Sequence, residues 1–122
     1  MEHKISVAVI GGDRRLTAAA ERLAQLGMSV RAFGFEAGRI PAAGSLAAAA
    51  EAEALLFGLP FSKDGESVFA PFAKDTITVK EICGLLQPRH TVFAGHPDAG
   101  ALASMRAAGA NVIDYTEDEA FT

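Results

Sequence analysis

The stretch VAVIGGDRRLTAAAERLAQLG, from Val7 to Gly27, decides the fold. Its β-branched, apolar start is typical of a strand buried on both faces, and the run Ile5–Ile10 belongs to it. After the glycine pair, apolar residues recur at helical spacing, at positions 16, 19, 20, 23 and 24. Gly27 suits the left-handed position that ends a helix. The stretch therefore predicts a strand, a tight turn and a helix.

Size and composition restrict the class of protein. The chain has 122 residues, half of them hydrophobic, which is enough for one domain with a single core. The net charge of −4 and the few aromatic residues argue against a nucleic-acid partner. One cysteine, Cys83, excludes an internal disulfide, and no run approaches the ~20 apolar residues of a membrane span. We expect a cytoplasmic α/β domain without a membrane partner.

Strand and helix patterns alternate along the rest of the chain. Further strands are predicted at 29–33, 54–59, 91–94 and 111–115, and further helices at 45–52, 78–86 and 98–108. Ser45 is expected to cap the second helix, and Thr78 with Glu81 forms a capping box at the third. Alternation of this kind predicts a parallel sheet in a flavodoxin-like or Rossmann-like three-layer sandwich, with strand order 2-1-3-4-5.

One segment is too long for an ordinary loop of such a fold. PFSKDGESVFAPFAKDTI, from Pro60 to Ile77, is predicted to form a small hairpin excursion after the third strand. It carries Phe61, Phe69 and Phe72, which form either a satellite core or a face that docks a partner. The core interpretation is slightly favoured.

The glycine pair does not match a nucleotide-binding loop. The dinucleotide fingerprint G-x-G-x-x-G, counted from Gly11, requires glycine at positions where Asp13 and Leu16 stand. Asp13 also supplies, at the helix start, the negative charge that a diphosphate would bring. The simplest interpretation is a tight turn with Asp13 as the helix cap. A phospho-receiver domain is excluded as well, because the third strand ends without a carboxylate.

Several residues nevertheless meet where open α/β sheets bind ligands, at the carboxyl ends of the central strands. Arg14 and Arg15 offer guanidinium groups for a substrate carboxylate, and Arg14 is favoured. Ser62 is either a ligand for the substrate or a loop hydroxyl. His96 with Asp98 suits acid–base work, although Asp98 equally suits a helix cap.

His3, His90 and Cys83 give weaker indications of a functional role. His3 and His90 are expected to be exposed, and three scattered histidines predict no metal site. Cys83 is expected on the core side of its helix as an inert thiol.

Five stretches together resemble the N-terminal domain of the A subunit of dipicolinate synthase from spore-forming bacteria. They are VAVIGGDRR at 7–15, FGFE at 33–36, LPFSKDGE at 59–66, FAG at 93–95 and DYTEDEAFT at 114–122. The resemblance spans nearly the whole chain, and the combination of IGGD-R with LP-S--DGE is its most specific part.

The resemblance implies a role for the domain. The full subunit would be at least twice as long and would bind NADP on a second domain, leaving no cofactor on this chain. It would form dipicolinate from a dihydrodipicolinate-type precursor in the mother cell during sporulation, with a flavoprotein-like second subunit. This chain would be the substrate-side domain, inactive alone, with Gly11, Gly12, Asp13, Arg14, Ser62 and His96 near a dicarboxylate substrate. A subunit-assembly module that docks through residues 60–77 is the alternative, and homo-oligomerisation is left open.

Overall fold

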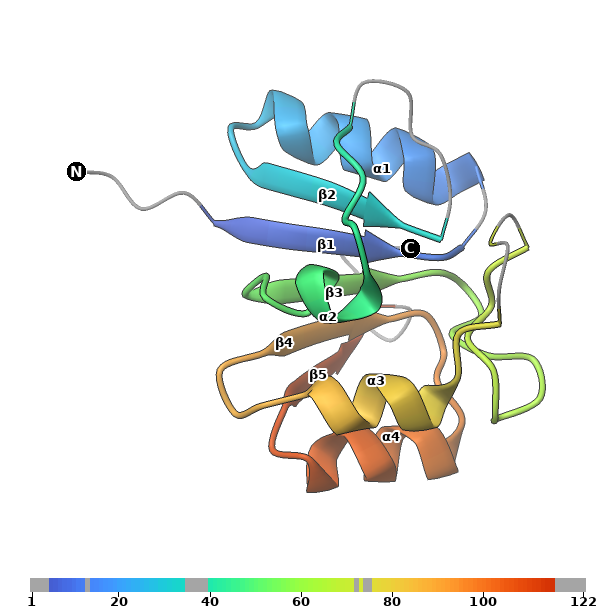
Figure 1. Cartoon of the computed structure of the whole chain (residues 1–122). Helices are drawn as coiled ribbons and strands as arrows, with labels where there is room; N and C mark the ends of the chain where they lie inside the picture. Colours follow the sequence, from blue (N-terminus) through green and yellow to red (C-terminus); the bar gives the residue numbers. More distant parts are fainter. Residues whose placement is uncertain (1–4, 13, 35–39, 72, 74–75, 116–122) are drawn as a thin grey trace.

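The computed structural model describes residues 5–12, 14–34, 40–71, 73 and 76–115 (Figure 1). Its strands are β1 (Ser6–Ile10), β2 (Ser29–Phe33), β3 (Ala54–Phe57), β4 (Thr91–Ala94) and β5 (Asn111–Asp114). Its helices are α1 (Arg14–Gln25), α2 (Leu46–Ala49), α3 (Val79–Leu85) and α4 (Ala99–Ala107).

The strands form one sheet in the order β2-β1-β3-β4-β5, and every neighbouring pair is parallel. The predicted α/β class and strand order are therefore confirmed. A parallel sheet of this kind arises because each short strand is joined to the next through a helix that crosses the sheet. The main difference from the prediction is α2, which spans four residues and ends before the expected boundary at Ala52.

The two faces of the sheet carry separate hydrophobic cores. Side chains alternate along β1, so Val7 and Val9 pack beneath α1, whereas Ala8 and Ile10 point to the opposite face. Figure 1 shows α1 on one side of the sheet and α2, α3 and α4 on the other. Both cores include residues of the central strands β1 and β3, which explains their continuous apolar sequences.

Side-chain caps begin three of the helices, as the sequence predicts. Ser45 Oγ, Thr78 Oγ1 and Asp98 Oδ2 each accept a hydrogen bond, 3.0–3.1 Å long, from the backbone N–H three residues further on. These caps satisfy amides that the helices themselves cannot pair. The helix-ending glycine Gly27 has the left-handed φ of 93° that its position requires.

The long excursion after β3 is fixed to the domain rather than detached from it. Isolated antiparallel bridges join Ser62 to Val68 and Ser67 to Thr78, which is a minimal form of the expected hairpin. Phe61 is completely buried, and its ring meets the Phe57 ring edge-on with centroids 4.9 Å apart. The core interpretation thus holds for Phe61, so that side chain is not part of a docking face. Phe72 lies outside the described residues.

The expectation that His90 is exposed is wrong. Its side chain is 1% exposed, and the ring bonds to backbone on both sides. Nδ1 accepts from the Gln87 N–H at 2.9 Å, so Nε2 carries the proton and donates to the Ala50 carbonyl at 2.6 Å. The neighbouring Arg89 donates to the carbonyls of residues 50, 51 and 52. Both side chains tie the loop before β4 to the segment that follows α2.

The buried His90 predicts a pH dependence of stability. Burial lowers the pKa of His90 below its usual 6.5. Below pH 6.5 the unfolded chain therefore binds more protons than the folded chain at this site. The stabilising contribution is complete above about pH 6.5. It is lost as the pH falls from there through the lower pKa of the folded state.

Urea unfolding at a series of pH values measures this effect. We expect His90→Gln to flatten the decline in the free energy of unfolding between pH 7 and 5. His96→Gln is the matched control, since His96 is exposed, and it should leave the decline as it is in the parent. An unchanged slope in His90→Gln would show that the His90 proton is not involved.

Candidate functional site

The candidate site lies at the carboxyl ends of β1, β3 and β4. The chain leaves β1 into α1 on one face of the sheet, whereas α3 and α4, which follow β3 and β4, lie on the other face (Figure 1). The strand order thus reverses at this point, where open α/β sheets bind their ligands.

The glycine pair after β1 allows the turn to contact the end of β2, the residue after β3 and the excursion near Ala70. Gly11 and Gly12 have φ values of 63° and 83°, and the Gly11 N–H donates to the Phe33 carbonyl at 2.8 Å. A Cβ on Gly11 would lie 2.8 Å from the Ala70 Cβ, and a Cβ on Gly58 would lie 2.8 Å from the Gly12 Cα. Side chains at these positions would force the segments apart.

The Gly12 N–H, which a phosphate would need, already has a partner within the chain. It donates to the Phe69 carbonyl at 2.7 Å, so the backbone of the excursion at Phe69 lies against the turn. In nucleotide-binding loops such amides point at the ligand phosphates instead. The Gly12 amide is therefore not available to a phosphate in this structure. Asp13 lies outside the described residues, and its capping role stays a prediction.

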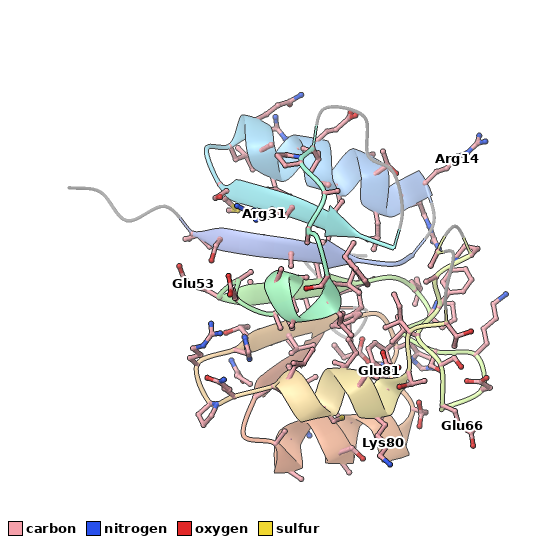
Figure 2. All side chains as sticks on the ribbon, viewed as in Figure 1. Arg14, Arg31, Glu53, Glu66, Lys80 and Glu81 are labelled. Carbon is pink, nitrogen blue, oxygen red and sulfur yellow. The ribbon has the colours of Figure 1, made fainter. Side chains whose placement is uncertain are left out.

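The two arginines at the start of α1 differ in what they reach. Arg14, which the sequence favoured as a carboxylate ligand, is exposed and extends away from the domain (Figure 2). Arg15 instead reaches the loop after β3, where Nη2 donates to the Leu59 carbonyl at 3.0 Å. Arg15 thus places a cation beside the loop after β3, although the sequence favoured Arg14.

The Ser62 hydroxyl forms its hydrogen bonds within the turn that follows it. Its hydroxyl donates to Asp64 Oδ1 at 3.2 Å and accepts from the Gly65 N–H at 2.9 Å. The same carboxylate oxygen accepts from the N–H groups of Glu66 and Ser67 at 2.8 and 2.7 Å. These backbone hydrogen bonds, from Ser67 and then Glu66, lower the pKa of Asp64. The geometry therefore supports the loop-hydroxyl interpretation of Ser62.

The segment after β4 brings His96 to the same edge of the sheet. His96 is exposed, has a φ of 50°, and donates its backbone N–H to Asp114 Oδ1 at 3.1 Å. Asp98 caps α4, as described above, which was one of its two predicted roles. The preceding Gly95 is tightly enclosed, because an added Cβ would lie 2.6 Å from the Tyr115 hydroxyl oxygen.

Tyr115 was not singled out from the sequence as part of this edge. Its hydroxyl donates to the Phe57 carbonyl at 3.0 Å, so it ties the residue after β5 to the end of β3 across β4. A lone tyrosine at the end of a predicted strand gives no sequence signal for such a contact.

Metal and thiol chemistry receive little support in the described ranges. Between Ile5 and Tyr115, outside the gaps given above, no three His, Cys, Asp or Glu side chains gather as a metal site would need. Cys83 is half-buried, and burial raises the pKa of its thiol, which disfavours the reactive thiolate.

No described helix is long and apolar enough to cross a membrane.

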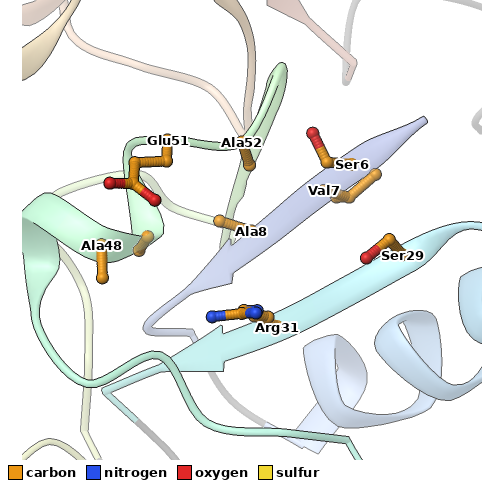
Figure 3. Close-up of a pocket in the computed structure, with 9 residues that line it drawn as sticks. Ser6, Val7, Ala8, Ser29, Arg31, Ala48, Glu51 and Ala52 are labelled. Atoms are coloured by element: carbon orange, nitrogen blue, oxygen red, sulfur yellow. The ribbon is translucent and has the colours of Figure 1, made fainter. Parts of the chain in front are cut away.

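A hollow of about 190 Å³ lies elsewhere, between α2 and the strands β1 and β2 (Figure 3). Ser6, Ser29 and Arg31 line it from the strands, and Glu51 and Ala52 line it from beyond α2. Ser6 and Ser29 begin their strands, so the hollow is near the amino ends and is separate from the candidate site.

These features define an α/β domain with an open parallel sheet, in which the Gly12 N–H at the carboxyl edge is bonded within the chain. The chain belongs to the family of N-terminal domains of the dipicolinate synthase A subunit, whose model matches residues 6–116.

Two solved structures share the fold. The dipicolinate synthase A chain from Bacillus subtilis superposes with a TM-score of 0.77 over 96% of this chain, at 16% identity. The A subunit of dipicolinate synthase from Bacillus halodurans gives a TM-score of 0.72 over 93%, also at 16% identity. The chain spans 42% and 41% of these two proteins. Comparison with the curated proteins gave no match.

The close approach at the turn can be tested with a pair of glycine substitutions. Gly11→Ala forces a side chain into a left-handed backbone and against Ala70, and should cost about 1–3 kcal/mol of unfolding free energy. Gly84→Ala is the control, because an added Cβ at Gly84 in α3 would meet open space, and the substitution should raise the unfolding free energy by up to about 1 kcal/mol. Denaturant unfolding measures both. Equal effects of the two substitutions would mean that the turn is not tightly packed.

Proposed function

We propose that this chain is the substrate-side domain of a dipicolinate synthase A subunit, with the coenzyme bound by a separate domain of the longer protein. The observation that carries the proposal is the hydrogen bond from the Gly12 N–H to the Phe69 carbonyl. It occupies the turn that would hold a diphosphate, in a chain whose family is that of the synthase. The two solved relatives are more than twice as long as their matched parts, which leaves room for a coenzyme domain.

The proposed reaction is the NADP-linked conversion of a dihydrodipicolinate-type precursor into dipicolinate. This chain would bind and orient the substrate at the carboxyl ends of β1, β3 and β4. A dicarboxylate needs cationic partners, and the guanidinium of Arg15 already lies against the loop after β3. Arg14, one residue earlier, would supply a second cation once the longer protein encloses the site.

The other expected site residues fall into two groups. Gly11, Gly12 and Ser62 would act indirectly, because their polar groups maintain the turn and the excursion that shape the edge. His96 is exposed beside Asp114 and is the described side chain that best suits proton transfer there. Asp13 lies outside the described residues, and its part in substrate binding is proposed from its place in the sequence alone.

The partner subunit and the cellular location are inferred from the family and are part of the same proposal. Both solved relatives are the A component of their synthase, which supports a second kind of subunit, and we expect that one to be flavoprotein-like. The setting would be the cytoplasm of the mother cell in a sporulating bacterium.

Calorimetry with NADP tests the proposal that the coenzyme binds to a separate domain and not to this chain. We expect no heat of binding when NADP at up to about 1 mM is titrated into the 122-residue chain, since the Gly12 amide is taken. The longer protein is titrated in parallel as the positive control, and it should bind NADP. Binding by the 122-residue chain below about 10 μM would contradict the proposal.

Titration of the chain with dipicolinate, followed by NMR, tests the proposed substrate edge. Loss of a charge-assisted hydrogen bond should weaken binding about tenfold or more in Arg15→Ala, with a smaller loss in Arg14→Ala. Arg22→Ala is the matched control, because Arg22 lies in the last turn of the same helix, at the other end of the sheet. If all three variants bind alike, the carboxyl-end site is wrong.

A further inference from the structure

The hollow beside α2 arises because small side chains meet there on one face of the sheet. The strand register pairs Ser6 with Ser29 at the start of β1 and β2. Two residues further on it pairs Ala8 with Arg31, so all four side chains lie on the same face and line the hollow. Opposite them, α2 spans four residues and contributes only the methyl groups of residues 48 and 49. So short a helix does not fill the space over the first residues of the two strands.

Two side chains of opposite charge lie on different sides of this hollow. Arg31 extends from β2, and Glu51 lies just beyond α2 (Figure 3). Both side chains are exposed, and within the described part of the chain no ion pair or side-chain hydrogen bond engages either of them. The guanidinium and the carboxylate are therefore both available to groups of opposite charge on a ligand.

The amino ends of the strands add hydroxyl groups to the lining. Ser6 Oγ accepts a hydrogen bond from the Glu53 N–H at 2.9 Å, so its hydroxyl proton can be donated to a ligand. Ser29, which pairs with Ser6 in the register, carries a second hydroxyl group. The hollow thus combines one cation, one anion and two hydroxyl groups with a wall of alanine side chains, which are Ala8, Ala48, Ala49 and Ala52.

This lining suits a small molecule that carries both charges. A guanidinium group binds a carboxylate through two parallel hydrogen bonds, and an ammonium group donates to a carboxylate. The volume of 190 Å³ corresponds to roughly six water molecules, which is the space that about six non-hydrogen atoms need. An α-amino acid with a short apolar side chain has this size and both charges, and its side chain would lie against the alanine methyl groups.

We propose that the hollow beside α2 is a second binding site, which takes a small zwitterionic amino acid with its carboxylate on Arg31 and its ammonium group on Glu51. The hollow is at the amino ends of the strands, whereas the proposed dicarboxylate edge is at their carboxyl ends. This site therefore does not depend on the proposed reaction.

NMR titration of the 122-residue chain with L-alanine tests the site. L-Alanine should shift the amide signals of Ala8, Arg31 and Ala52, with a Kd of about 1–10 mM. Propionate lacks the ammonium group, and ethylamine lacks the carboxylate. Each should bind at least about tenfold more weakly than L-alanine, because each loses one charge-assisted interaction.

Substitutions distinguish binding in the hollow from binding elsewhere on the surface. Arg31→Ala and Glu51→Gln should each weaken L-alanine binding about tenfold. Arg106→Ala and Glu81→Gln are the matched controls and should leave it unchanged, since both residues are exposed on helices that do not line the hollow. Ala48→Leu should abolish binding with both charges in place, because the larger side chain fills the hollow.

The amide spectrum of each variant shows whether it is folded, and Arg31→Gln replaces Arg31→Ala if that variant is not. Propionate that binds as tightly as L-alanine would make the hollow a simple anion site and overturn the proposal. Unchanged amide signals at about 50 mM L-alanine would overturn it as well. The same holds if the substitutions of Arg31 and Glu51 leave binding as it is in the parent.

Discussion

The structure depends on the contact between the turn after β1 and the excursion after β3. At this contact the Gly12 N–H is bonded to the Phe69 carbonyl, and Gly58 lies against Gly12 without space for a side chain. One hydrogen bond of this kind contributes only about 1 kcal/mol. Its larger effect is geometric, because it brings β1, β3 and the excursion together at the edge where the strand order reverses. The same glycines that resemble a phosphate loop therefore serve the packing of the chain against itself.

The fold could be predicted from the sequence because its signals are local. The apolar run Ile5–Ile10, the helical stripe through Leu16 and Ala20, and the caps at Ser45, Thr78 and Asp98 are all read within a few residues. Once the elements alternate, the rules for parallel connections leave few arrangements. The strand order then follows without any knowledge of long-range contacts.

The candidate site was less predictable because its decisive contacts join residues far apart in the sequence. The carbonyl of Phe69 reaching Gly12, and Tyr115 reaching Phe57, carry no motif. The choice between Arg14 and Arg15 depended on the direction in which each side chain leaves the first turn of α1, which spacing alone does not give. His90 was predicted to be exposed, whereas its ring is buried between two backbone segments that are far apart in the sequence.

Different groups form the hydrogen bonds that stabilise the loops at the two ends of the sheet, and this difference affects how a ligand can bind. At the amino ends, Arg89 and His90 bind the carbonyls that follow α2, and at the carboxyl ends backbone amides bind carbonyls of other loops. Among the described residues at the carboxyl edge, the N–H groups of Gly11, Gly12 and Gly95 are therefore committed to the fold, unlike those of a nucleotide cradle. If the proposed dianionic substrate binds at this edge, arginine side chains would supply the cations that it needs. The demand for side-chain cations agrees with a dicarboxylate better than with a coenzyme, whose diphosphate is normally held by free amides at a helix start.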